Sequence, residues 1–101
     1  MLITRWQAAL TPTKEQIFML FEAEGLEANE EIYKTDSKIK EHRHPFNEVR
    51  VILDGEMFFN IGGTQFVLRA GDRVEIPANT RHSFHAQGNQ DCTTICAFRH
   101  F

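Results

Sequence analysis

The stretch HRHPFNE, residues 42–48, decides what kind of fold this chain adopts. It holds His42, His44 and Glu48, and side chains two residues apart share one face of an extended strand. In an α-helix the same two-residue step turns a side chain by about 200° around the axis, which would scatter the three. His82 supplies a third imidazole. Three imidazoles and a carboxylate suit a first-row divalent metal, so a site made from them requires β-structure.

The rest of the sequence supplies that β-structure as short apolar runs separated by turn signals. The run EVRVIL leads to Asp54-Gly55 and the run EMFFNI leads to Gly62-Gly63, which are both hairpin signals. Later runs stop near Gly71 and Pro77. This spacing predicts about seven antiparallel strands in a sandwich or small barrel. A parallel sheet is not expected, because no crossover helices lie between the runs.

The first 30 residues form an extension in which we predict one short helix. Thr11 or Thr13 can cap its start, and Thr13 with Gln16 fits a capping box. Gly25 is suited to end it. The apolar side of this helix is expected to pack against the sheet, and it consists of Ile17, Phe18, Leu20 and Phe21. With 101 residues, the chain is expected to form a single domain over residues 1–101.

The composition narrows the range of possible functions and of cellular compartments. A net charge of −3 does not indicate a positively charged surface that would attract nucleic acid or an anionic membrane. No apolar run resembles a signal peptide or a membrane span, so we expect a cytoplasmic protein. Cys92 and Cys96, if they share one strand, lie roughly 13 Å apart. That distance exceeds the reach of a disulfide, and free thiols fit a reducing compartment.

Two blocks of this sequence resemble the motifs of the cupin superfamily, over roughly residues 36–86. The first motif, G-x5-H-x-H-x3/4-E-x6-G, is matched by His42, His44, Glu48 and Gly55. The second, G-x5-P-x-G-x2-H-x3-N, is matched by Gly71, Pro77 and His82. Three positions depart from the motifs, and none of them is a ligand position: Asp36, Asn79 and Ala86.

The resemblance implies an all-β fold, a single cupin jelly-roll β-barrel carrying one short N-terminal helix. It also implies a mononuclear site with one divalent transition metal, held by His42, His44, Glu48 and His82. Fe, Mn, Ni, Co and Zn all accept such ligands, so the sequence does not identify the ion. The alternative is a metal-free cupin, or four solvated surface groups.

The alternation of side chains along a strand also predicts which residues lie beside the metal ligands. Arg50 and Ile52 share the face of Glu48, and Phe84 shares the face of His82. The predicted walls of a substrate pocket are Phe46, Ile52 and Phe84. An arginine inside a barrel needs a partner. Either Arg50 binds an anionic group of a small-molecule substrate, or it pairs with Glu48 or another acid, or a bulge turns it outward.

The string His-x-His-x3-Glu-Val-Arg-x-Ile-Leu-Asp-Gly also resembles acireductone dioxygenases, which are cupins with three histidines and one glutamate on iron or nickel. That resemblance implies oxygen chemistry on a small oxygen-rich substrate, with Arg50 as a catalytic residue. The leading hypothesis is therefore a metal-dependent dioxygenase. The alternatives are a non-catalytic binding or sensing cupin, and a metal-dependent isomerase or lyase that would need a general base such as His85.

A homodimer is the expected assembly, because a barrel of this size has little core of its own. The strands at the two ends of the chain are expected to leave apolar edges that a second subunit covers. The candidate residues for that surface are Trp6, Phe98 and Phe101. His85 lies three residues from His82, so on one strand it faces the other way.

Overall fold

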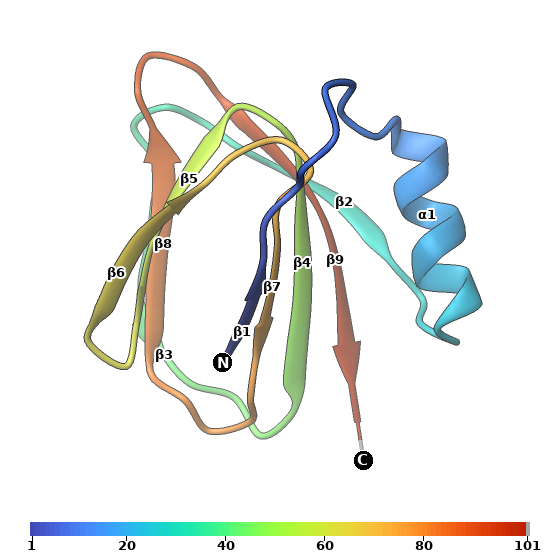
Figure 1. The fold of residues 1–101 in the computed structure, drawn as a ribbon. Helices are drawn as coiled ribbons and strands as arrows, with labels where there is room; N and C mark the ends of the chain where they lie inside the picture. Colours follow the sequence, from blue (N-terminus) through green and yellow to red (C-terminus); the bar gives the residue numbers. More distant parts are fainter. Residues whose placement is uncertain (101) are drawn as a thin grey trace.

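The computed structural model describes residues 1–100 as two facing β-sheets with one helix on the outside (Figure 1). The five-stranded sheet has the order β1-β7-β4-β9-β2, and the four-stranded sheet has the order β3-β8-β5-β6. All the strand pairs are antiparallel. The elements in chain order are β1 (Leu2–Thr4), α1 (Lys14–Ala23), β2 (Asn29–Tyr33), β3 (Lys38–His42), β4 (Asn47–Asp54), β5 (Glu56–Ile61), β6 (Thr64–Leu68), β7 (Arg73–Ile76), β8 (His82–Gln87) and β9 (Cys92–Arg99).

This arrangement confirms the all-β jelly-roll prediction and corrects one detail of it. The C-terminal strand was expected to leave an apolar edge, but β9 lies between β4 and β2 inside the five-stranded sheet. The edges of that sheet are β1 and β2. Trp6 and Phe98 are each 39% exposed, and Phe101 lies outside the described residues. The homodimer through these residues stays a prediction.

Strand β4 is buried on both faces. Val49 and Val51 point outward and pack with Ile17 and Phe21 of α1. The alternate residues, which are Glu48, Arg50 and Ile52, point toward the other sheet and are at most 3% exposed. The helix therefore covers the back of the strand that carries the predicted site.

The helix begins and ends where the sequence predicts. Thr13 is the N-cap, and its side chain accepts a hydrogen bond from the Gln16 backbone N–H while the Gln16 side chain accepts from the Thr13 N–H. At the other end Gly25 has a φ of 75°, and the N–H of Leu26 reaches back to the carbonyl of Phe21. This is the Schellman pattern, and it confirms the role of Gly25. Of the residues predicted for the apolar side, Leu20 is an exception at 55% exposed.

The space between the sheets is filled with apolar side chains. This core contains Ile52, Met57, Phe59, Ile61, Leu68, Val74, Ile76, Phe84, Ala86 and Cys92, each at most 4% exposed. Ile52 therefore lies in packed core rather than beside an open space. Within residues 1–100, no helix is long and apolar enough to cross a membrane.

A carboxylate ties the N-terminal segment to the barrel. Asp72 accepts hydrogen bonds from the backbone N–H groups of Trp6 and Arg69, at 2.8 and 2.9 Å, and from Arg5 Nη1 at 2.9 Å. Burial acts to raise the pKa of Asp72, but these bonds outweigh it and hold the pKa below its usual value. The Trp6 ring in turn lies against Gly71, where a Cβ would be only 2.5 Å from Trp6 Cγ.

Replacing Gly71 with alanine is expected to loosen this segment. Gly71 and Gly63 both have a φ of 91°, but a Cβ on Gly63 would meet nothing within 4 Å. Both alanine variants should lose about 1–2 kcal/mol of unfolding free energy to backbone strain. Gly71→Ala should lose about 1–3 kcal/mol more through overpacking against Trp6. Urea unfolding measures both losses, and only Gly71→Ala should shift the emission of the single tryptophan. Equal losses with unchanged emission would contradict this packing.

Candidate metal centre

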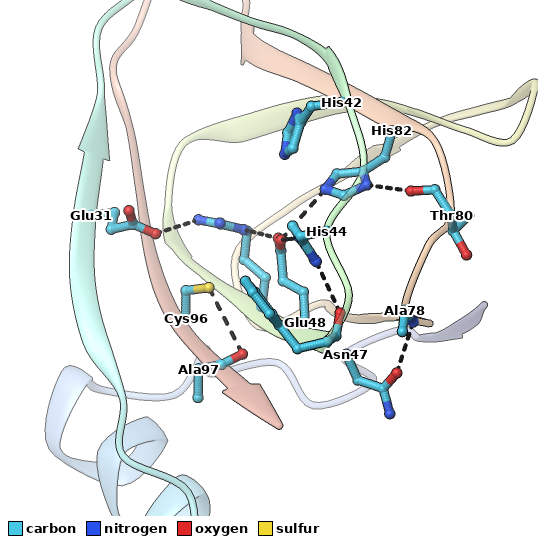
Figure 2. A network of polar contacts seen from close by, with 12 residues as sticks. Glu31, His42, His44, Asn47, Glu48, Ala78, Thr80, His82, Cys96 and Ala97 are labelled. Carbon is cyan, nitrogen blue, oxygen red and sulfur yellow. Dashed lines mark hydrogen bonds and ion pairs between the residues drawn. The ribbon is translucent and has the colours of Figure 1, made fainter. Parts of the chain in front are cut away.

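The three predicted histidines converge at one end of the barrel. His42 ends β3, His82 begins β8, and His44 lies in the loop between β3 and β4. One nitrogen from each ring lies within 4.8 Å of the others. The ring centroids of His42 and His82 are 4.2 Å apart, and those of His44 and His82 are 4.9 Å apart. Figure 2 shows the rings turned toward a common point.

Each ring is oriented by a backbone carbonyl two residues away. His42 Nδ1 is 2.8 Å from the Lys40 carbonyl, His82 Nδ1 is 2.8 Å from that of Thr80, and His44 Nδ1 is 2.9 Å from that of Phe46. A carbonyl only accepts, so each Nδ1 donates its proton to that carbonyl and Nε2 is the ring atom left to face a metal. Metal-ligating histidines are commonly held in this way.

Glu48 enters the same space from β4. Its Oε1 is 3.0 Å from His44 Nε2 and 3.5 Å from His82 Nε2. Burial favours the neutral carboxyl, but interactions with His82, Arg50 and His44 outweigh it and lower the pKa of Glu48 to about 2. Glu48 is therefore ionised at neutral pH and offers one carboxylate oxygen to the space among the three rings.

One buried atom in this space lacks a partner that a cation would supply. His82 Nε2 is buried without a hydrogen-bond partner, and it is the one such side-chain atom among the described residues. Its 3.5 Å separation from Glu48 Oε1 is too long for a good hydrogen bond. A buried polar atom without a partner is costly. A divalent metal would satisfy it, and the four residues fit the donor set of such an ion.

Aromatic rings pack around His44. Phe46 stacks on it with ring centroids 4.3 Å apart and an interplanar angle of 5°. Phe98 meets His44 edge-on at 5.7 Å and Phe46 at 4.8 Å. Phe46 thus lies beside His44, where the stack fixes the ring. Its part as a pocket wall stays a prediction.

Arg50 points into the protein, where its partners are protein groups. Its Nε donates to Glu48 Oε2 at 2.9 Å. Its Nη1 lies 3.0 Å from Glu31 Oε1, 2.8 Å from Thr94 Oγ1 and 3.2 Å from the Tyr33 hydroxyl. The guanidinium carbon also lies 4.9 Å from the centre of the Phe84 ring. Of the alternatives weighed from the sequence, these contacts favour pairing with Glu48.

Glu31, Tyr33 and Thr94 are the residues around the site that sequence reasoning missed. They come from β2 and β9 and reach Arg50 because these strands pair, with Tyr33 opposite Cys92 and Ile32 opposite Thr93. No motif marks them. The one available signal was alternation, since Glu31 and Tyr33 share a face of β2.

Other polar residues lie where the sequence places them. His85 is on the outer face of β8 and stacks on Phe58 at 5.0 Å, so it faces away from the metal centre. Cys92 and Cys96 are free, buried and on the single strand β9. Burial raises the pKa of each thiol to about 12, so neither is an activated nucleophile.

Comparison with known proteins identifies the family. The Cupin_2 profile, described as a cupin domain, matches residues 29–98 of this chain. The chain belongs to the cupin family.

Relatives of this cupin include dioxygenases. Acireductone dioxygenase of Bacillus licheniformis is 32% identical over 108 residues, covering 84% of this chain and 60% of that protein. Polyketide synthase CurC of Streptomyces cyaneus is 31% identical over 65 residues, covering 63% of this chain and 42% of that protein. This cupin thus matches less than two thirds of the length of either relative.

A solved structure shares the fold over nearly the whole cupin chain. It is acireductone dioxygenase from Bacillus anthracis with a cadmium ion in its active centre. The TM-score is 0.70 at 23% identity, and the match covers 96% of this chain and 76% of that one.

We expect this protein to bind one divalent transition metal per chain. His82→Ala removes the buried Nε2 and should weaken Co²⁺ binding by at least about 100-fold, since losing a ligand should cost at least as much as losing a residue that only orients one. His85→Ala removes an imidazole from the same strand but the opposite face, and its affinity should match the unmodified protein. Titration against a chromophoric chelator measures both. Equal affinities for the two variants would place the metal elsewhere.

Proposed function

We propose that this cupin is a metal-dependent dioxygenase acting on a small oxygen-rich organic substrate. Its metal ligands would be His42, His44, Glu48 and His82. The observation that carries the proposal is the convergence of three imidazoles, each with one nitrogen within 4.8 Å of the others and with its Nδ1 already bound to a backbone carbonyl. The relatives named as acireductone dioxygenases support oxygen chemistry at such a centre.

A divalent ion at these residues supplies a Lewis acid, and a redox-active ion such as iron also supplies a means of activating O₂. The protein determines how a substrate reaches it. Glu48 and His82 are buried, whereas His42 and His44 are only partly buried, so the approach is from the side of His42 and His44. Behind the site the apolar core fills the barrel. A small substrate that binds at the barrel end fits this arrangement.

Among the predicted pocket walls, Phe46 fits that approach because it is partly buried and stacked on His44. Phe84 and Ile52 are buried in the core, and as walls they remain part of the proposal. Arg50 has a smaller share in substrate binding than the sequence suggested. Its Nε and Nη1 are taken by protein groups, and only Nη2 is left for an anionic substrate.

The pairing of Arg50 favours a second candidate, a non-catalytic cupin whose metal binds a small ligand. A guanidinium already neutralised by two glutamates does not require a substrate anion. The isomerase or lyase alternative required His85 to face inward as a general base, but His85 faces outward.

Oxygen uptake separates the two candidates. Protein purified without a chelating resin and loaded with Fe²⁺ or Ni²⁺ should consume O₂ when given small enediols or diketones. His82→Ala should abolish the uptake, and His85→Ala should leave it unchanged. Stoichiometric metal with no oxygen consumption across these substrates would refute the dioxygenase and support the ligand-binding cupin.

Replacing Arg50 is expected to disturb the metal centre before anything else. Arg50→Met keeps roughly the volume of the side chain but frees Glu48 Oε2 from its partner. Loss of a residue that orients a metal ligand typically weakens metal binding by about 10–100-fold, so Co²⁺ affinity should fall within that range. A residue that only binds substrate would leave Co²⁺ affinity intact and weaken turnover instead. That second pattern would restore Arg50 as a substrate clamp.

A further inference from the structure

We propose that Glu31 is a positioning residue of the metal centre, acting through Arg50 on the ligand Glu48. The proposal rests on the metal site argued above. Glu31 lies on β2, an edge strand of the five-stranded sheet, whereas Glu48 lies on β4 with β9 between them. The guanidinium of Arg50 contacts both glutamates across that gap.

The contacts form a chain of charges. Glu31 Oε1 is 3.0 Å from Arg50 Nη1, and Arg50 Nε is 2.9 Å from Glu48 Oε2. Because Oε2 is held by Arg50, only Oε1 of Glu48 faces the rings of His44 and His82. The guanidinium therefore determines which carboxylate oxygen is offered to a metal and in which direction.

Among residues 1–100, Glu31 is the one charged partner of Arg50 apart from Glu48 itself. Thr94 and Tyr33 also bind Nη1, but both are neutral. The Arg50 side chain is 3% exposed, and a buried cation without compensating charge is strongly unfavourable. Without Glu31, Glu48 would have to neutralise Arg50 alone and also bind the metal.

The charge of Glu31 also matters for the ion. A divalent cation beside Glu48 would lie close to the Arg50 cation, and like charges at low local dielectric repel. With Glu31 present, the two glutamates and Arg50 sum to −1. Without it they sum to zero, so the attraction for a divalent cation falls. Orientation and charge both predict weaker metal binding when Glu31 is neutralised.

The neighbouring Glu30 offers a matched control. It lies on the same strand with its side chain on the other face, where it pairs with Lys14 of α1 at 2.9 Å. An exposed pair of this kind contributes little to stability. Glu30→Gln and Glu31→Gln are identical chemical changes, one residue apart, and only one of them touches Arg50.

The experiment measures Co²⁺ affinity by competition with a chromophoric chelator, together with the visible spectrum of the Co²⁺ protein. Glu31→Gln keeps a hydrogen-bond acceptor but loses the charge, and we expect about tenfold weaker binding, the lower end of the range for residues that orient a ligand. The Co²⁺ bands should also shift, because Glu48 is reoriented. Glu31→Asp keeps the charge and should retain most of the affinity, and Glu30→Gln should match the unmodified protein.

A double-mutant cycle tests whether the effect passes through Arg50. In an Arg50→Met background, Glu31→Gln should change Co²⁺ affinity by less than twofold, because the connecting cation is gone. An equal tenfold loss in both backgrounds would overturn the relay. A lower melting temperature of the metal-free Glu31→Gln protein with unchanged Co²⁺ affinity would also overturn it, since that is the result for a purely structural residue.

The test also separates this inference from the proposed function. If the unmodified protein binds Co²⁺ and Glu31→Gln binds it equally well, the relay is refuted and the metal site stands. If the unmodified protein binds no divalent metal, the metal site is refuted and the relay is refuted with it.

Discussion

Strand β4 is buried on both faces, and the rest of the structure depends on this constraint. Val49 and Val51 pack under α1, and the alternate residues Glu48, Arg50 and Ile52 lie between the sheets. A slip of one residue in the pairing would exchange the two sets. It would put a glutamate and an arginine under an apolar helix and remove Glu48 from the histidines. The packing of α1 against Val49 and Val51 therefore also fixes the register of the metal centre.

A charged residue on the inner face of such a strand must be neutralised within the protein. Glu48 is 2% exposed and Arg50 is 3% exposed, so each would be costly alone. Their pairing satisfies Glu48 Oε2 and leaves Oε1 for the histidines. Arg50 then requires further partners, which come from β9 and β2 on the far side of the guanidinium. The polar network thus extends from the centre of the sheet to its edge, because each added charge needs another to balance it.

The parts of the site that could be predicted from the sequence are those governed by local geometry. Alternation along β4 places Glu48 and Arg50 on the same face. The same strand argument does not hold for the histidines, because His42 ends β3 and His44 lies in the loop before β4. The partners of Arg50 could not be predicted in this way. Glu31 is 19 positions from Arg50 and Thr94 is 44 positions away, and they meet only because β9 lies between β4 and β2. The same strand order explains why the C-terminal strand, expected at an edge, is interior. Strand order depends on long-range packing that no short pattern reveals.

The orientation of each histidine ring is set by nearby residues, whereas the convergence of the three rings depends on the whole fold. Each Nδ1 binds a carbonyl two residues away, so the direction of each ring is set within its own short segment of chain. What brings the three rings together is the pairing of β3 with β8, where His42 lies opposite His82, and a hydrogen bond from the Asn79 N–H to the His44 carbonyl at 2.7 Å. Asn79 has a φ of 61°, which asparagine tolerates better than most residues, and it replaces a glycine of the cupin motif. Asn79 therefore preserves the turn that places His82 close to the ring of His44. A site assembled in this way presents its donors already aimed at one point, so a metal could bind without reordering the chain.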